Sequence, residues 1–172
     1  MDQEHVALSM RAIATTKKAC ATNMLVSQKT GWAINFECAP DEAFPLYPEN
    51  GIIVHANHWV SQTALLKLKD TGTATAPDSF YRDWRVRRLL DEKGSEITMA
   101  DLKAALFDDF LSPYSVCRPP RPGLRGDITA SVAMIVMDPS AGVMEVAPLP
   151  ALNRNFTRYS LGDQPRLLEA AE

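Results

Sequence analysis

The chain has 172 residues, of which 46% are apolar and 23% charged, and its formal net charge is -3. This length suits one domain with a buried core, and the weak negative charge argues against nucleic acid or an anionic membrane as a partner. No apolar run approaches the ~20 residues of a membrane-spanning helix, and the acidic start is unlike a signal peptide. We therefore expect a single cytoplasmic domain over residues 1–172.

The cysteine content also fits a cytoplasmic protein. Cys20, Cys38 and Cys117 are widely spaced, odd in number and contain no Cys-x-x-Cys pair. Neither a disulfide framework nor a structural zinc site follows from this pattern, so we expect reduced thiols.

The first third of the chain alternates between regular elements and loops. Apolar residues three and four positions apart predict a helix over residues 6–19. Apolar residues at every second position predict a strand over 32–38, which pairs with a strand over 23–27. Three prolines mark residues 39–50 as a loop, and the apolar run that follows predicts a strand over 51–55.

Two helices are expected in the middle of the chain. Asp78 is a candidate cap for the first, and Gly94 lies where it would end. Thr98 and Asp101 have the spacing of a capping box, which predicts a second helix that ends near Phe110.

The last third returns to strands. Residues 112–127 are rich in proline and form a predicted loop, and strands are expected over 129–137 and 143–147. The strand over 129–137 is apolar on both faces, as in a sheet that is covered on both sides. A short helix is expected at the end of the polar tail. Together these elements predict an α+β fold in which helices are segregated from antiparallel sheet.

Several short segments between residues 10 and 161 point to one family. They are Ala-Thr-Asn-Met-Leu at 21–25, Asn-Phe-Glu-Cys-Ala-Pro at 35–40, Val-His-Ala-Asn-His-Trp at 54–59, Pro-Tyr-Ser-Val-Cys-Arg at 113–118, Ala-Ser-Val at 130–132, Val-Met-Asp at 136–138, Val-Ala-Pro at 146–148 and Phe-Thr-Arg-Tyr-Ser-Leu at 156–161. In this order and spacing they resemble the acyl-coenzyme A:6-aminopenicillanic acid acyltransferase family of cysteine N-terminal-nucleophile (Ntn) hydrolases.

The resemblance implies an αββα sandwich made as a precursor that cleaves itself before a cysteine. The freed cysteine thiol is the nucleophile, and its own α-amine, with a pKa near ~7.7–8.0, is the base. The segments quoted lie downstream of that cysteine, so this chain is expected to be the C-terminal part of the β-subunit. It would contain no nucleophile, lack the N-terminal strands and be inactive alone.

Two histories fit that expectation: a truncated gene product, or a degenerate homologue that binds a small acyl or peptide ligand or pairs with a separate N-terminal half. The missing strands would leave sheet edges open and one side of the strand over 129–137 uncovered. The intact protein would act on an amide or thioester, for some members an acyl-coenzyme A, and neither a metal nor a prosthetic group is implied.

The resemblance assigns roles to four residues. Asn57 would donate its side-chain N–H to the oxyanion of a tetrahedral intermediate, and Arg118, His55 and Tyr114 would contact substrate. From the residues alone, Asn57 is better explained by a strand end where it satisfies backbone groups, and Arg118 equally suits a surface loop. The chain departs from the family pattern beside Arg118, where Pro119 stands in place of histidine.

Other residues are candidates for metal binding, thiol chemistry or a charged surface. His55 and His58 are three residues apart, but without a third clustered ligand they favour local hydrogen bonds over a metal site. Cys117 next to Arg118 suggests a reactive thiol, whereas the resemblance places it in packing or pocket lining, and Cys20 and Cys38 are expected to be buried. The arginines between residues 82 and 88 predict a solvated helix face.

Overall fold

The computed structural model describes residues 5–123 and 126–162, which form four α-helices and three small antiparallel sheets. The helices are α1 (Val6–Thr15), α2 (Gln62–Lys67), α3 (Asp78–Asp91) and α4 (Met99–Leu106), and a short 3-10 helix, η1, spans Gly72–Ala74. The strands are β1 (Thr22–Ser27), β2 (Ala33–Cys38), β3 (Ala43–Leu46), β4 (Arg121–Pro122), β5 (Ile128–Thr129), β6 (Ala133–Asp138), β7 (Val143–Pro148) and β8 (Thr157–Ser160). The predicted α+β class is confirmed. None of the helices in these two ranges has the length and apolar character needed to cross a membrane.

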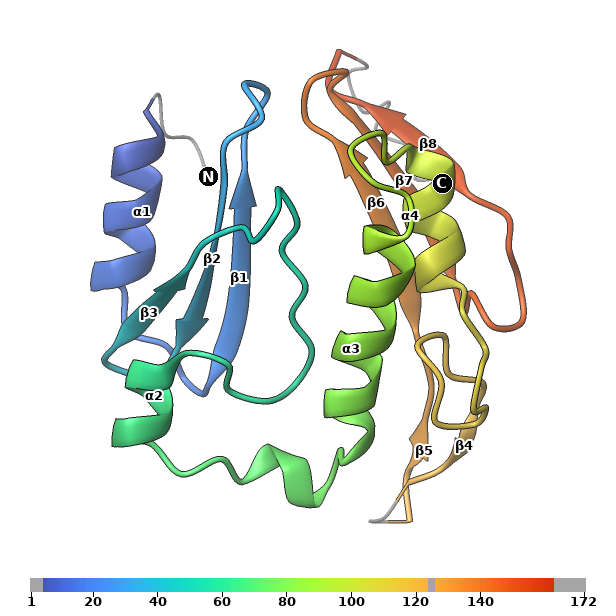
Figure 1. The fold of residues 1–172 in the computed structure, drawn as a ribbon, viewed down its shortest axis with the longest axis horizontal. Coiled ribbons are helices and arrows are strands. Elements are labelled where there is room, and N and C mark those ends of the chain that lie inside the picture. Colours follow the sequence, from blue (N-terminus) through green and yellow to red (C-terminus); the bar gives the residue numbers. More distant parts are fainter. Residues whose placement is uncertain (1–4, 124–125, 163–172) are drawn as a thin grey trace, which may run out of the picture.

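The first sheet has the order β1–β2–β3 and is covered on one face by α1 (Figure 1). Ile34, Phe36 and Cys38 alternate along β2 and pack with Ile13 of the helix. This period-two apolar pattern is the one that predicted the strand, and its burial against a helix explains why the strand forms there.

The second sheet has the order β6–β7–β8 and is covered on one face by α4. Met134 and Val136 of β6 are buried and pack with Leu102 and Leu106 of the helix. Ile135 and Met137 point to the opposite face, where they are largely exposed. The expectation that one side of this strand is uncovered is confirmed.

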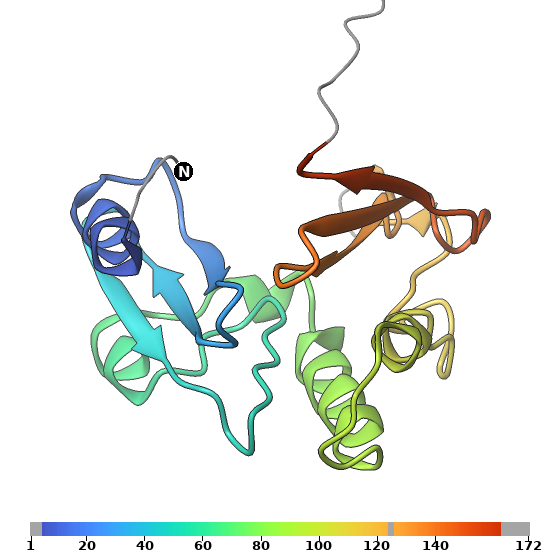
Figure 2. The same ribbon diagram turned by 90° about the horizontal axis from the view of Figure 1, so that it is seen from above.

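Each half of the molecule pairs one sheet with helices. Figure 2 shows α1 beside the first sheet, and α3 and α4 beside the second sheet. The segment that contains α2 and η1 runs between the two halves. The loop from residue 55 to residue 61 lies along this path, between β3 and α2.

Several boundaries differ from the sequence prediction in the first half. The helix expected over 6–19 ends at Thr15, and the loop expected over 39–50 contains β3. Pro45 lies inside β3 and is tolerated because β3 is an edge strand that pairs only with β2. The strand expected over 51–55 is reduced to a single bridge between Glu49 and Ile52.

The second half shows similar shifts. Asp78 does not cap α3, because the N-cap is Pro77 and the Asp78 carboxylate binds Arg82 instead. The Thr98–Asp101 capping box is present, but α4 ends four residues before Phe110. The strand expected over 129–137 is divided into β5 and β6, and β8 was not predicted at all. The short helix expected at the end of the tail lies outside the described residues.

Candidate functional site

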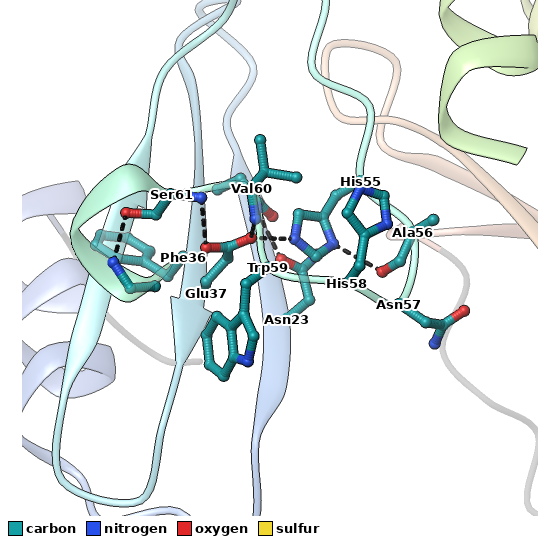
Figure 3. A network of polar contacts seen from close by, with 12 residues as sticks. Asn23, Phe36, Glu37, His55, Ala56, Asn57, His58, Trp59, Val60 and Ser61 are labelled. Carbon is teal, nitrogen blue, oxygen red and sulfur yellow. Dashed lines mark hydrogen bonds and ion pairs between the residues drawn. The ribbon is translucent and has the colours of Figure 1, made fainter. Parts of the chain in front are cut away.

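A buried carboxylate on β2 fastens the loop that carries the predicted site. Glu37 is only 1% exposed and accepts hydrogen bonds from His55 Nε2 at 2.7 Å, Val60 N–H at 2.5 Å and Ser61 N–H at 2.9 Å (Figure 3). Burial by itself would raise the pKa of Glu37, but the bond from His55 and the two backbone bonds outweigh it and hold that pKa below its usual range. An ionised carboxylate therefore holds the loop against the sheet.

His55 is held at both ring nitrogens. Its Nε2 faces Glu37, and its Nδ1 lies 2.8 Å from the carbonyl oxygen of Ala56. Both ring nitrogens therefore face oxygen atoms of the protein, and neither is directed toward a metal ion. Within residues 5–123 and 126–162, no three His, Cys, Asp or Glu side chains are grouped so as to hold a metal.

The next turn of the loop is held by α3. Ser79 is fully buried, and its hydroxyl accepts the Asn57 backbone N–H at 2.7 Å and lies 2.8 Å from His58 Nδ1. The serine hydroxyl still has its own proton, which it can donate to His58 Nδ1 when the imidazole is neutral. Burial, opposed by the charge of Asp83, lowers the pKa of His58, in agreement with this geometry.

The Asn57 side chain is fixed by a chain of charges. Arg82 Nη2 donates to Asn57 Oδ1 at 2.7 Å, and Arg82 Nε donates to Asp78 Oδ2 at 2.8 Å. Arg118 Nη1 donates to the same Asp78 oxygen at 3.2 Å. Because Arg82 binds the amide oxygen, the amide nitrogen Nδ2 is left to donate hydrogen bonds to another group. In Figure 3 this side chain points away from the Glu37–His55 pair.

These groups surround a cavity of about 300 Å³. Its lining residues come from the start of β1, from β2, from the loop after β3 and from the turn before η1: Ala21, Thr22, Asn23, Glu37, His55, Ala56, Asn57, His58, Trp59, Asp70, Thr71 and Gly72. Asn57 and His55, both predicted to act in the site, therefore line the same cavity. We call it the Asn57 cavity.

Arg118 and Tyr114 line a different cavity, of about 600 Å³. Its wall is formed by the segment before α3, the loop after α4 and the β4–β5 ribbon: Thr75, Ala76, Pro77, Tyr114, Arg118, Arg121, Gly123, Asp127, Ile128, Thr129, Ala130 and Val132. We call it the Arg118 cavity. The four predicted residues are thus placed in two cavities, which are linked by the bonds from Asn57 through Arg82 and Asp78 to Arg118.

No cysteine lines either cavity in the described parts of the chain. Cys38 and Cys117 are buried, and burial raises the pKa of both thiols, so neither has the thiolate character of a nucleophile. The packing interpretation of these two residues agrees with their burial. The expectation that Cys20 is buried is wrong, because it is exposed at the end of the loop that precedes β1.

Three residues of this arrangement were missed in the sequence. The alternation along the strand predicts Glu37 only on its polar side, and no local pattern marks Ser79. Arg82 was placed on a solvated helix face, which is wrong because its side chain is 12% exposed. The Asp78–Arg82 spacing of four residues was a readable signal, whereas the contacts of Glu37 and Ser79 with a distant loop left no local trace.

No protein-family model matches the chain, and no curated protein matches it. Its function is therefore inferred from the chemistry of these two cavities and from the segments quoted above.

Proposed function

We propose that this chain carries the carbonyl-polarising part of an acyl-transfer site of the cysteine Ntn type. The substrate would be a small amide or thioester, and the donor to its carbonyl oxygen would be the Asn57 side chain. The nucleophile would be a cysteine outside these 172 residues. The three free thiols fit a reducing, cytoplasmic setting.

One observation carries this proposal: the orientation of the Asn57 amide by Arg82. The guanidinium occupies the amide oxygen, Ser79 holds the backbone of the same residue, and Asp78 holds Arg82 in turn. A donor that is fixed before the reaction needs no reorganisation when charge develops on a carbonyl oxygen. Such a donor contributes about 2.7–4 kcal/mol to an acyl-transfer transition state.

The proposed step conserves atoms and charge. A cysteine thiolate adds to the carbonyl carbon, and the electron pair of the C=O bond moves to the oxygen, which accepts a hydrogen bond from Asn57 Nδ2. Collapse of this oxyanion expels a thiolate, or an amine that receives the proton which the α-amine of the cysteine took from its thiol, and leaves an acyl-enzyme. Water or an amine then takes the acyl group by the same addition and collapse.

The packing of one helix on each sheet supports a partial αββα sandwich, the finer form of the expected fold. Ile13 of α1 packs on the first sheet, and Leu102 and Leu106 of α4 pack on the second. The polar residues Asn35 and Glu37 lie on the opposite face of the first sheet from α1, beside the Asn57 cavity.

Carbonyl polarisation can be measured directly. The full chain is mixed with a neutral thioester labelled with carbon-13 at its carbonyl, and the isotope-edited infrared difference spectrum is recorded. Bound thioester should absorb at lower wavenumber than free thioester, because a hydrogen bond to the oxygen weakens the C=O bond. Asn57→Ala should abolish the shift.

The matched control is Asn155→Ala, which removes an exposed amide from the loop between β7 and β8. It should leave the shift unchanged. A labelled carbonyl that binds without any shift, or a shift that survives Asn57→Ala, would remove Asn57 from the role proposed.

A second candidate is a non-catalytic binding protein that pairs with a separate N-terminal half. The exposed apolar residues Ile135 and Met137 on the uncovered face of β6 favour it. The DNA upstream of Met1 distinguishes the two. An in-frame extension that encodes a cysteine supports the enzyme, whereas a stop codon followed by a ribosome-binding site supports the binding protein.

A further inference from the structure

The Arg118 cavity contains chemistry that the proposed acyl transfer does not use. It shares no lining residue with the Asn57 cavity, and its polar wall includes Arg118, Arg121 and Thr129. Arg121 and Thr129 lie directly opposite each other in the β4–β5 ribbon, so their side chains leave the ribbon on the same face.

Positive charge exceeds negative charge around this cavity. Arg118 and Arg121 line it, and Arg82 lies next to Arg118 through their shared partner, Asp78. Burial, reinforced by the charge of Arg82 and opposed by Asp78, lowers the pKa of Arg118, and Arg121 adds to the same effect. Arg82 and Arg121 therefore both lie close enough to Arg118 to repel its charge, and Asp78 is the counter-charge of Arg82 and Arg118.

Asp127 is the acid among the lining residues, and it does not neutralise the arginines. Among the described residues it forms no ion pair with Arg118 or Arg121. Its Oδ1 lies instead against Gly123, where an added Cβ would come within 2.3 Å of it. The absence of a side chain at Gly123 leaves room for the Asp127 carboxylate, which therefore lies next to the backbone of the ribbon.

Three polar atoms of the wall have no hydrogen-bond partner within the described residues. They are Arg118 Nε, Arg121 Nε and Thr129 Oγ1, and all three are buried. Buried polar groups without partners are rare in folded proteins, because each has lost its bonds to water. Arg118 Nε and Arg121 Nε are donors, and the Thr129 hydroxyl can donate as well, so a ligand that contacts all three would be an acceptor.

Arg121 is also oriented by an aromatic ring. Its guanidinium carbon lies 4.1 Å from the centroid of the Tyr114 ring. Arg121 Nη1 also donates a long hydrogen bond of 3.4 Å to the Pro122 carbonyl oxygen. The planar guanidinium has five N–H groups, so others are left for an oxyanion, whose oxygens match their spacing.

We propose that the Arg118 cavity binds the oxyanion group of a small molecule, a phosphate or a carboxylate, with Arg121, Arg118 and Thr129 as its donors. A metal cation would meet surplus positive charge here, and a neutral ligand would leave that charge uncompensated. An oxyanion supplies both the charge and the acceptors, after a small rotation of the arginine side chains.

Titration calorimetry of the full 172-residue chain with inorganic phosphate, and separately with acetate, tests this site at low ionic strength. At least one of the two anions should bind saturably. Arg121→Gln should weaken that binding about tenfold and Thr129→Val about threefold, because each removes a donor. The matched control is Arg11→Gln, which removes the same charge from an exposed position on α1.

Saturable binding of phosphate alone identifies a phosphorylated ligand, and binding of acetate alone identifies a carboxylate; both support the site. If neither anion saturates, or if Arg11→Gln weakens binding as much as Arg121→Gln, the site does not exist. Circular dichroism checks the fold of each variant. If Arg121→Gln unfolds, two other variants test the site: Thr129→Val, and Arg121→Lys, which keeps the charge but lacks the planar guanidinium. Weaker anion binding in both supports the site, and unchanged binding in both contradicts it.

The proposal is independent of acyl transfer. Neither Arg121 nor Thr129 lines the Asn57 cavity, so loss of anion binding in these variants leaves the infrared test of Asn57 unaffected.

Discussion

The two three-stranded sheets are built alike and differ in what their second faces carry. Each is antiparallel, and each buries one apolar face against a helix. On the first sheet the other face presents polar residues, and Glu37 there is buried by the loop that it binds. On the second sheet the other face presents Ile135 and Met137 to solvent. The polar second face of the first sheet binds a loop that lines a cavity, whereas the apolar second face of the second sheet stays exposed among the described residues.

The largest test of this difference compares two glutamates on the central strands. Glu37→Gln on β2 should lower the free energy of unfolding by about 3–5 kcal/mol, because His55 and two backbone N–H groups lose a buried charged acceptor. Glu145→Gln on β7, which removes a partner of Lys103, should cost about 0–1 kcal/mol. Urea denaturation of both variants gives the comparison, and equal losses would mean that Glu37 does not fasten the loop.

The same network gives the first sheet a dependence on pH. The folded pKa of Glu37 is depressed, so its stabilising contribution is present above the unfolded pKa and is lost as the pH falls through the folded value. Unfolding measured against pH should therefore show a larger acid destabilisation in the wild type than in Glu37→Gln. Parallel curves for the two proteins would contradict this assignment.

A smaller effect compares two methionines on β6. Met134 is 6% exposed and packs beneath α4, whereas Met137 is 59% exposed on the uncovered face. Met134→Ala should cost about 2–3 kcal/mol, at the low end for buried methionine, and Met137→Ala less than about 0.5 kcal/mol. The measurement is again urea denaturation. A substantial loss in Met137→Ala would show that this face is covered in solution, for example by a second copy of the chain.

The smallest expected effect concerns the helix under the second sheet. The hydrogen bond from Thr98, together with Lys93, lowers the pKa of Asp101 from 3.8 to about 2. Its support of the α4 cap should persist above pH 3.8 and disappear as the pH falls through about 2. Carbon-13 NMR of the Asp101 carboxyl group would report this value, and a normal pKa would show that the capping box does not form in solution.

Local patterns predicted much of the fold. The alternation in β2 and the Thr98–Asp101 box were readable because they depend on neighbours in sequence. β3 and β8 could not be predicted in this way. Pro45 in β3 is a typical loop residue, and a short polar strand such as β8 has no sequence pattern that distinguishes it from a loop. For the site, the resemblance supplied Asn57, but the residues that hold it come from α3 and are separated from it by more than twenty positions.

The shared carboxylate of Asp78 gives the molecule one further property. Arg82 and Arg118 bind the same oxygen, so a ligand that draws Arg118 away leaves Arg82 as its sole guanidinium partner and alters the grip on Asn57. Such a movement would couple ligand binding in the two cavities. Thermodynamic reciprocity requires the effect to be equal in both directions, whichever ligand arrives first.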